Sequence, residues 1–154
     1  MTKPIKTTLI TNASIFDGTG AAPFLGDLLI EGNTIKSITT AGAQADIAAD
    51  IKIDARGKFL MPGMTEGHAH LSFDDFTCTE DLISPPVEEH AFLTARVAKK
   101  LLDAGFTSAY GASEAKLRLG VAVRNEGNAG RIPGPRIRAG SIELSVTGAM
   151  GDES

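Results

Sequence analysis

The sequence predicts an α/β chain, in which a β-rich segment over residues 1–58 precedes alternating strands and helices over residues 59–154. In the first segment, short β-branched or apolar runs are separated by glycine-containing turns, which is the pattern of strands. In the second, an apolar strand, an alanine-rich helical stripe and another strand follow one another, which favours parallel strands with helices packed outside. Glycine is abundant, at 17 residues, and only 5% of residues are aromatic. Both values favour a turn-rich architecture over a helical bundle.

Strands are expected at four places in the first segment. The turn Gly32-Asn33 between two of them is a hairpin signal. Two or more such hairpins predict a small β-sandwich over residues 1–58. The expected strands are Thr7–Asn12, Asp27–Glu31, Thr34–Ile38 and Ile51–Asp54.

The second segment begins with an apolar stretch, Phe59–Thr65, which runs into a strand over Met64–Leu71. A loop is expected over 72–86. A helix follows to Leu102, because alanines and a leucine recur along it at spacings of four, three and four residues. Gly105 is expected to end that helix.

Three further elements are expected after this helix. Phe106–Tyr110 is a strand candidate, and Ser113 is placed to cap a helix over 114–127. Ile137–Val146 is a further strand candidate, after a loop rich in glycine and proline. The predicted order after residue 59 is therefore β, α, β, α, β, as in the first part of an α/β barrel.

Composition excludes several classes of function. The formal net charge is −4 and the basic residues are scattered, so we expect no nucleic-acid partner. No apolar run approaches the roughly 18 residues that span a bilayer, so no membrane segment is expected. Cys78 is the single cysteine, which excludes an internal disulfide and favours a reducing, cytoplasmic location.

His68 and His70 are the candidate metal ligands. Side chains alternate between the two faces of a strand, so both imidazoles are expected on one side, together with Glu66. A shared divalent ion such as zinc would bind two neighbouring neutral imidazoles. Glu66 is placed to accept a hydrogen bond or to orient a ligand. A chance His-X-His pair without metal stays open on the pattern alone.

Other residues are interpreted more plainly. Tyr110 lies at a predicted strand end, where it would either line a pocket or pack with its hydroxyl at the rim. Met150 lies at another and is also a pocket-lining candidate. His90 follows two glutamates at a helix start and is expected to be a solvated surface residue. Cys78, in an acidic loop, is not expected to be a nucleophile.

Several stretches together resemble the amidohydrolase superfamily. Residues 15–20 and 28–35 are similar to the first turn and hairpin of its β-sandwich, and 60–71 to its first barrel strand, with Pro-Gly ahead of His-X-His. Residues 104–108 and 132–136 resemble the second strand entry and the loop before the third strand. The spacing and the Gly-Pro-Arg segment are most similar to the imidazolonepropionase and Xaa-Pro dipeptidase-like branch.

The resemblance implies a hydrolase that uses a metal-activated water to cleave an amide-type C–N bond of a small-molecule substrate: an amide, an N-acyl amino acid, a dipeptide or a carbamate. It implies one or two divalent ions, with zinc expected, held in part by His68 and His70. Two positions depart from the family pattern. Glu66 stands where relatives usually have Asp, and Met150 where the branch often has His.

Residues 59–154 are far fewer than the about 250 of a complete (β/α)8 TIM barrel. We therefore expect an incomplete barrel, inactive alone, whose C-terminal part supplies the remaining ligands and the general base. A homo-oligomer is also expected. One alternative is a cupin-like barrel, which the helical stripe over 88–102 disfavours. The other is a non-catalytic subunit or degenerate paralogue that serves as an interaction module.

Overall fold

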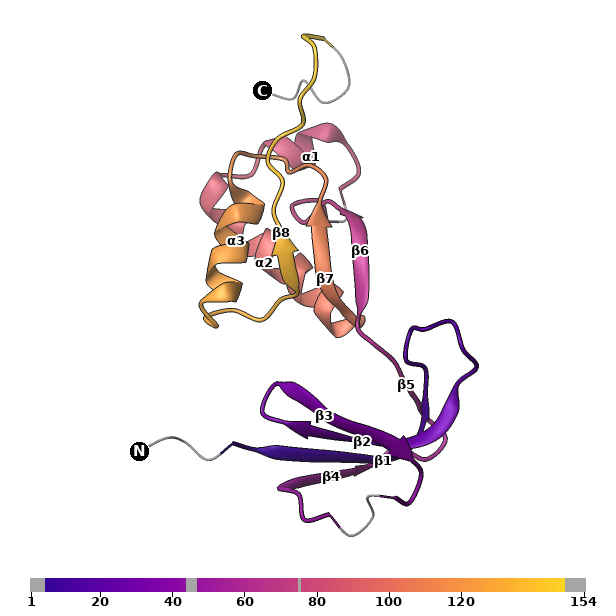
Figure 1. The fold of residues 1–154 in the computed structure, drawn as a ribbon. Coiled ribbons are helices and arrows are strands. Elements are labelled where there is room, and N and C mark those ends of the chain that lie inside the picture. Colours follow the sequence, from indigo (N-terminus) through magenta and orange to yellow (C-terminus); the bar gives the residue numbers. More distant parts are fainter. Residues whose placement is uncertain (1–4, 44–46, 75, 149–154) are drawn as a thin grey trace. The chain divides into compact units, whose positions relative to one another are not determined.

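The computed structural model describes residues 5–43, 47–74 and 76–148 of the chain. The chain divides into two compact units, Met1–Pro62 and Gly63–Ser154 (Figure 1). The first unit is a β-sheet, and the second combines a parallel sheet with helices. The predicted α/β fold class is thereby confirmed. No helix in the described stretches is long and apolar enough to cross a membrane.

The described residues of the first unit form one sheet with strand order β3-β2-β1-β4, and the short β5 also pairs with β1. β1 is antiparallel to β2 and parallel to β4 and β5, and β2 is antiparallel to β3. The strands are β1 (Thr7–Ile15), β2 (Phe24–Glu31), β3 (Thr34–Thr40), β4 (Ile51–Asp54) and β5 (Phe59–Leu60). The β2–β3 hairpin turns at Gly32, whose φ is 64°, as the sequence predicted.

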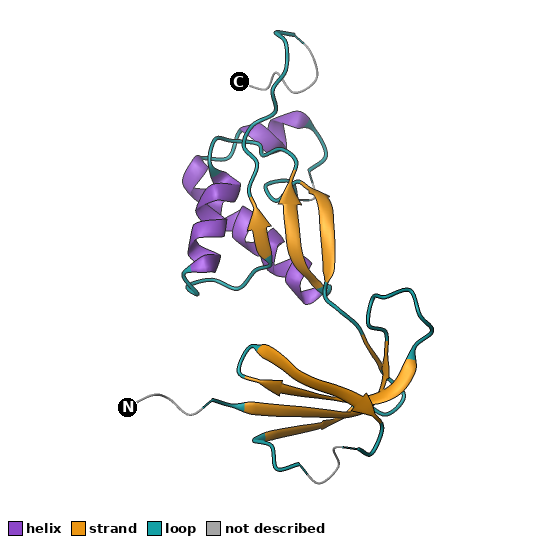
Figure 2. Cartoon of the chain, viewed as in Figure 1, coloured by secondary structure: helices purple, strands orange, loops and turns teal. Residues whose placement is uncertain are grey.

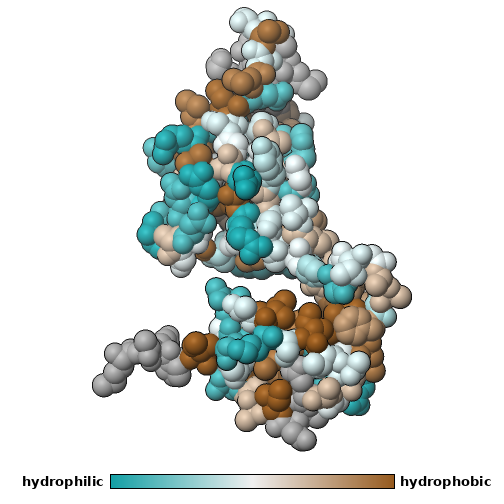
Figure 3. Space-filling model, in the orientation of Figure 1, coloured by the Kyte–Doolittle hydropathy of each residue, from teal (hydrophilic) through white to brown (hydrophobic). Residues whose placement is uncertain are grey.

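The predicted β-sandwich consists of two packed sheets, and the sheet described here is one of them. A sheet face that carries apolar side chains needs a second layer to bury them. The strands of this unit accordingly leave large apolar side chains exposed, and Figure 3 shows hydrophobic surface over them. They include Leu25, Ile35, Ile38, Ile53 and Phe59. The described residues of the unit thus provide one sheet where two were expected.

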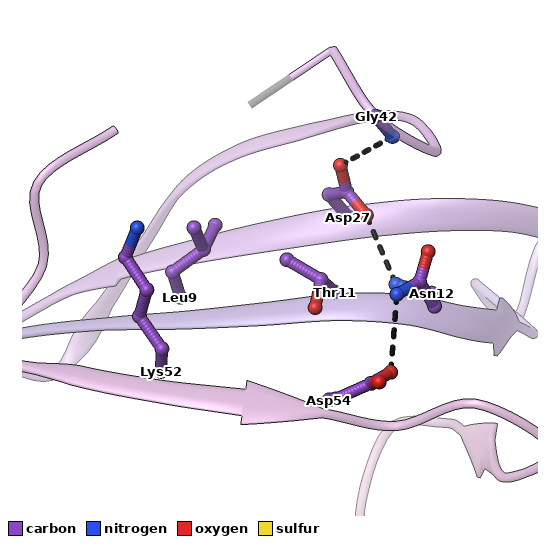
Figure 4. A pocket seen from close by; sticks show the side chains of 7 residues that line it. All are labelled: Leu9, Thr11, Asn12, Asp27, Gly42, Lys52 and Asp54. Carbon is purple, nitrogen blue, oxygen red and sulfur yellow. Dashed lines mark hydrogen bonds between the residues drawn. The ribbon is translucent and has the colours of Figure 1, made fainter. Parts of the chain in front are cut away.

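A bulge in β1 explains why this strand extends past Asn12, where the sequence predicts its end. Asn12 has a φ of 59°, and the pairing with β2 shifts register between Ile10 and Ala13. The carboxylate of Asp27, with 0% of its surface exposed, accepts the Asn12 N–H at 3.0 Å and the Gly42 N–H at 2.8 Å (Figure 4). Because the bulged N–H is satisfied, the strand continues past Asn12 to Ile15.

The second unit is a three-stranded parallel sheet of order β6-β7-β8. Its strands are β6 (Met64–Ala69), β7 (Phe106–Gly111) and β8 (Arg136–Arg138). Its helices are α1 (Thr79–Ile83), α2 (Val87–Asp103) and α3 (Leu119–Asn128). Figure 2 shows α2 and α3 on one side of the sheet. The predicted alternation of parallel strands with outer helices is confirmed.

The core of this unit lies between the sheet and the two long helices. Small side chains let the layers approach closely, and Ala98 on α2 faces Ala69 and Ala109 in the strands. The buried cluster is Ala69, Leu71, Ala98, Ala109, Val123 and Ile137. Gly105, whose φ is 96°, follows the last residues of α2, so the predicted helix end is confirmed.

Two local predictions were wrong about helices. The expected loop over 72–86 contains the short helix α1. The helix expected over 114–127 begins only at Leu119, after Arg118 in the left-handed conformation (φ 68°). Ser113 does not cap it, because both its carbonyl and its hydroxyl contact the ring of His70 instead.

The strand expected over 137–146 is present only at its start. β8 ends at Arg138, and no strand is found between Ala139 and Gly148. The backbone at Gly140 turns tightly against β7, where a Cβ on residue 140 would lie 2.6 Å from the Gly111 carbonyl oxygen. The apolar side chains after this point are exposed, including Leu144 and Val146.

The close approach of the Gly140 backbone to Gly111 leads to a testable prediction. A Cβ there would lie 2.7 Å from the Gly140 backbone nitrogen, so Gly111→Ala is expected to lower the free energy of unfolding by about 1–3 kcal/mol. Gly127, in α3, is the matched control, because a Cβ there meets no atom within 4 Å. Gly127→Ala is expected to be neutral or to stabilise by up to about 1 kcal/mol. Urea unfolding measures both, and equal effects would contradict the backbone contact.

Candidate metal centre

His68 and His70 lie side by side at the carboxyl end of β6. Their ring centroids are 4.9 Å apart, with the ring planes at 73°. His68 is exposed and His70 is half-buried. Ala69 between them is buried in the core against the helices, so the two imidazoles occupy the opposite side of the chain, as strand alternation predicted.

The ring of His70 is held from two directions. Phe73 stacks on it, with centroids 4.6 Å apart and planes at 12°. Its Nδ1 lies 3.2 Å from the carbonyl oxygen and 3.0 Å from the hydroxyl oxygen of Ser113, on the loop after β7. Both contacts use Nδ1, so the ring edge that carries Nε2 is directed away from Ser113.

Glu66 contacts the backbone of the pair. Its Oε1 accepts a hydrogen bond from the His68 N–H at 2.9 Å. The side chain therefore folds back onto the backbone of its own strand, two residues further along. The expected hydrogen bond is present, and its donor is a peptide N–H. A role for Glu66 toward a metal stays a prediction.

A buried network beneath the pair was missed from the sequence. The Glu114 carboxyl group is 3% exposed, and its Oε2 accepts the Ser72 N–H at 2.9 Å. The Ser72 carbonyl accepts a hydrogen bond from His90 Nε2 at 2.8 Å, and the Ser72 hydroxyl accepts one from the Ala115 N–H at 2.7 Å. The segment after β6 is thus tied to the loop after β7 and to α2.

Two of these residues differ from what the sequence predicts. His90 was expected on a solvated helix face, but it is 1% exposed, because the first turn of α2 packs beneath Ser72. Glu114 was expected inside a helix. A single buried acid in an irregular loop leaves no periodic pattern in the sequence. The only available signal was the polar pair Ser113-Glu114, which follows a predicted strand.

Burial raises the pKa of Glu114, and the hydrogen bonds from Ser72 and the charge of His70 oppose this only in part. The folded state then holds its proton to higher pH than the unfolded state, whose pKa is near 4.5. Stability from this group is therefore lost as pH rises from about 4.5 through the folded pKa. The unfolding free energy of Glu114→Gln minus that of the wild type is expected to grow over this range and then level off. A difference that stays flat or shrinks from pH 4 to 8 in urea titrations would contradict it.

The remaining candidates do not join the pair. Tyr110 is 56% exposed and alternates with core residues of β7, so it lies on the face of the sheet away from the helices. Its pocket-lining role stays a prediction. Met150 lies outside the described residues. Cys78 is exposed at the start of α1.

The donor atoms at the end of β6 suit a divalent transition metal. Imidazole nitrogens are common zinc ligands, and zinc in proteins normally takes four ligands. Two adjacent rings, one of them oriented through Nδ1, fit two of these positions. Within residues 5–43, 47–74 and 76–148, no group of three or more His, Cys, Asp or Glu side chains is arranged to hold a metal ion. The residues present therefore fit part of a site.

A depression of about 330 Å³ lies in the first unit, whereas the histidine pair belongs to the second (Figure 4). Its polar lining is joined by structural hydrogen bonds: Asp27 accepts from Asn12, and the Asn12 side chain donates to Asp54 at 3.0 Å. The lining residues are Leu9, Thr11, Asn12, Asp27, Gly42, Lys52 and Asp54. We interpret this depression as part of the bulge in β1.

Comparison with known proteins gives two sequence relatives. The chain is 40% identical over 68 residues to a 5′-deoxyadenosine deaminase of Methanothermobacter thermautotrophicus, which covers 44% of the chain and 15% of that protein. It is 37% identical over 76 residues to a dihydroorotase of Syntrophotalea carbinolica, covering 49% and 17%. No protein-family model matches.

Solved structures share the fold over almost the whole chain. A prolidase complexed with N-methylphosphonate-L-proline superposes with a TM-score of 0.80 at 24% identity, over 96% of this chain and 35% of that one. A Xaa-Pro dipeptidase with bound methionine gives 0.75 at 24% identity, over 86% and 32%. The chain thus spans about a third of these structures and about a sixth of the sequence relatives. These likenesses show that the chain has the fold of the corresponding part of these hydrolase structures.

Proposed function

We propose that the chain forms part of a metal-dependent hydrolase that cleaves amide-type C–N bonds in small molecules. The observation that carries the proposal is the pair of adjacent imidazoles at the carboxyl end of β6, with His70 held through Nδ1. In α/β barrels this end of the strands is the catalytic face. Relationship to prolidases and other amidohydrolases supports the reaction class.

His68 and His70 would each provide an imidazole nitrogen to a divalent ion, with zinc the expected metal. Such an ion supplies Lewis acidity, which polarises a carbonyl group and activates water near neutral pH. Stacking on Phe73 and the contact with Ser113 keep the His70 ring from rotating away. The Glu66 carboxylate accepts a hydrogen bond from the His68 N–H and so helps to fix the strand backbone that carries the first ring.

The described residues supply two ligands, and zinc takes about four. We propose that the other ligands and the proton-transferring group come from the polypeptide that completes the barrel. The substrates proposed are amides, N-acyl amino acids, dipeptides such as Xaa-Pro, and carbamates. The same proposal includes assembly into a homo-oligomer and a cytoplasmic location.

Metal removal tests this function. The purified complete protein would be stripped with a chelator, then assayed with and without added zinc against Xaa-Pro dipeptides, N-acyl amino acids and carbamates. Hydrolysis of at least one class is expected only after zinc is restored. Hydrolysis that persists undiminished in the stripped protein, with residual metal verified as absent, would overturn the proposal.

A further inference from the structure

The two strand-end loops of the second unit meet through a set of hydrogen bonds centred on Ser72. The loop after β7 offers the Ser113 carbonyl to His70 and the Glu114 carboxylate to the Ser72 N–H. The Ala115 N–H of the same loop donates to the Ser72 hydroxyl. Consecutive residues of one loop thus contact His70 and the residue two positions beyond it.

The contact with the Ser113 carbonyl favours a hydrogen on Nδ1 of His70. A carbonyl oxygen can only accept, so the 3.2 Å approach of Nδ1 is a hydrogen bond only when Nδ1 is protonated. The Ser113 hydroxyl, 3.0 Å from the same nitrogen, can accept from it or donate to it, so the carbonyl is the contact that favours the Nδ1–H form. In the neutral ring, Nε2 then has a free lone pair, which is the form that binds a metal.

Glu114 fixes the backbone that carries this ring. Its carboxylate is buried, and its Oε1 packs where a Cβ on Gly120 would lie 2.6 Å away, at the start of α3. The carboxylate therefore has little room to shift. Oε2 accepts a hydrogen bond from the Ser72 N–H, and His90 donates one to the Ser72 carbonyl. Both backbone polar groups of Ser72 are therefore held in place.

We propose that Ser113 and Glu114 are the positioning residues of the candidate metal site. The Ser113 carbonyl selects the Nδ1–H tautomer of His70, and Glu114 holds the segment after β6 so that this contact forms. Metal affinity in this inference rests on the proposed function. The tautomer does not, because it is a property of the metal-free ring.

Nitrogen NMR of the metal-free protein tests the tautomer directly. Spectra of the His70 ring would be recorded above the ordinary imidazole pKa of about 6.5, where the ring is neutral. The wild type is expected to carry its hydrogen on Nδ1. Ser113→Ala, which keeps the carbonyl and loses only the hydroxyl, is expected to give the same tautomer. An Nε2–H ring in the wild type, or a change of tautomer in Ser113→Ala, would overturn the role of the carbonyl.

Variants of Glu114 test the positioning. Glu114→Ala is expected to give a mixture of tautomers and to weaken zinc binding about 10–100-fold, measured by competition with a chromophoric chelator. Glu114→Gln keeps an oxygen that accepts from Ser72, so it is expected to restore both properties. Unchanged tautomer and affinity in Glu114→Ala, or failure of Glu114→Gln to restore them, would overturn the role of Glu114. If the wild type has the Nδ1–H ring but binds no zinc, the proposed function fails while the tautomer assignment stands.

Discussion

The double variant His68→Ala, His70→Ala is expected to abolish stoichiometric metal loading of the purified complete protein. The two imidazoles lie together at the carboxyl end of β6, with ring centroids 4.9 Å apart. Removing one ligand of a zinc site weakens binding strongly, and removing both leaves too few donors to hold the ion. Elemental analysis after dialysis against metal-free buffer measures the result.

Cys78 provides the matched control for this variant. Thiolates are strong zinc ligands, and Cys78 is exposed, but it lies at the start of α1 outside the histidine pair. Cys78→Ser is therefore expected to retain full metal content. Loss of metal in Cys78→Ser, or retention in the double histidine variant, would show that the ion is held elsewhere.

Asp27→Ala is expected to lower the free energy of unfolding by roughly 2–4 kcal/mol, the largest single-residue effect on stability that we predict. The carboxylate is fully buried and accepts backbone hydrogen bonds from Asn12 and Gly42. A donor left unsatisfied in the interior costs about 1–3 kcal/mol, and the deleted side chain adds a cavity. Gly42 is exposed, so water can replace part of the loss there.

Two controls bracket this prediction. Asp27→Asn keeps one accepting oxygen, so its loss in chemical unfolding is expected to be about half as large. Asp103→Ala removes an exposed carboxylate that pairs with Lys99, and such a surface pair contributes about 0–1 kcal/mol. If Asp27→Ala and Asp103→Ala destabilise equally, Asp27 does not stabilise the bulge of β1.

Regular elements were predictable because local chemistry repeats along them. The stripe of alanines gave α2 almost at its observed bounds, and Gly32 and Gly105 marked a hairpin and a helix end through the positive φ that glycine accepts. The Gly32 hairpin needs only its own residues. In each case the information lies within a few positions of sequence, so the pattern identifies the element without tertiary contacts.

Irregular elements were not predictable, because their cause lies far along the chain. The bulge at Asn12 depends on Asp27, fifteen residues away, and β8 ends where Gly140 meets Gly111. The burial of His90 depends on the Ser72 carbonyl, which its helical pattern does not reveal. Long-range hydrogen bonds of this kind leave no period in the sequence.

The candidate site likewise contains residues that the sequence predicted and residues that it did not. The His-X-His spacing on a strand was enough to expect His68 and His70 on one side, and the rings do lie together. Ser113 and Glu114 were assigned to a helix cap and a helix, because serine is a preferred residue at a helix N-cap. Their contacts with His70 and Ser72 arise only once parallel strands bring two loops together.

Anomalous diffraction at the zinc edge, from crystals of the zinc-loaded complete protein, tests the central claim most directly. The account predicts an anomalous peak about 2.0–2.1 Å from a ring nitrogen of both His68 and His70. A zinc peak bound by other residues, with these two rings making only hydrogen bonds and packing contacts, would contradict it.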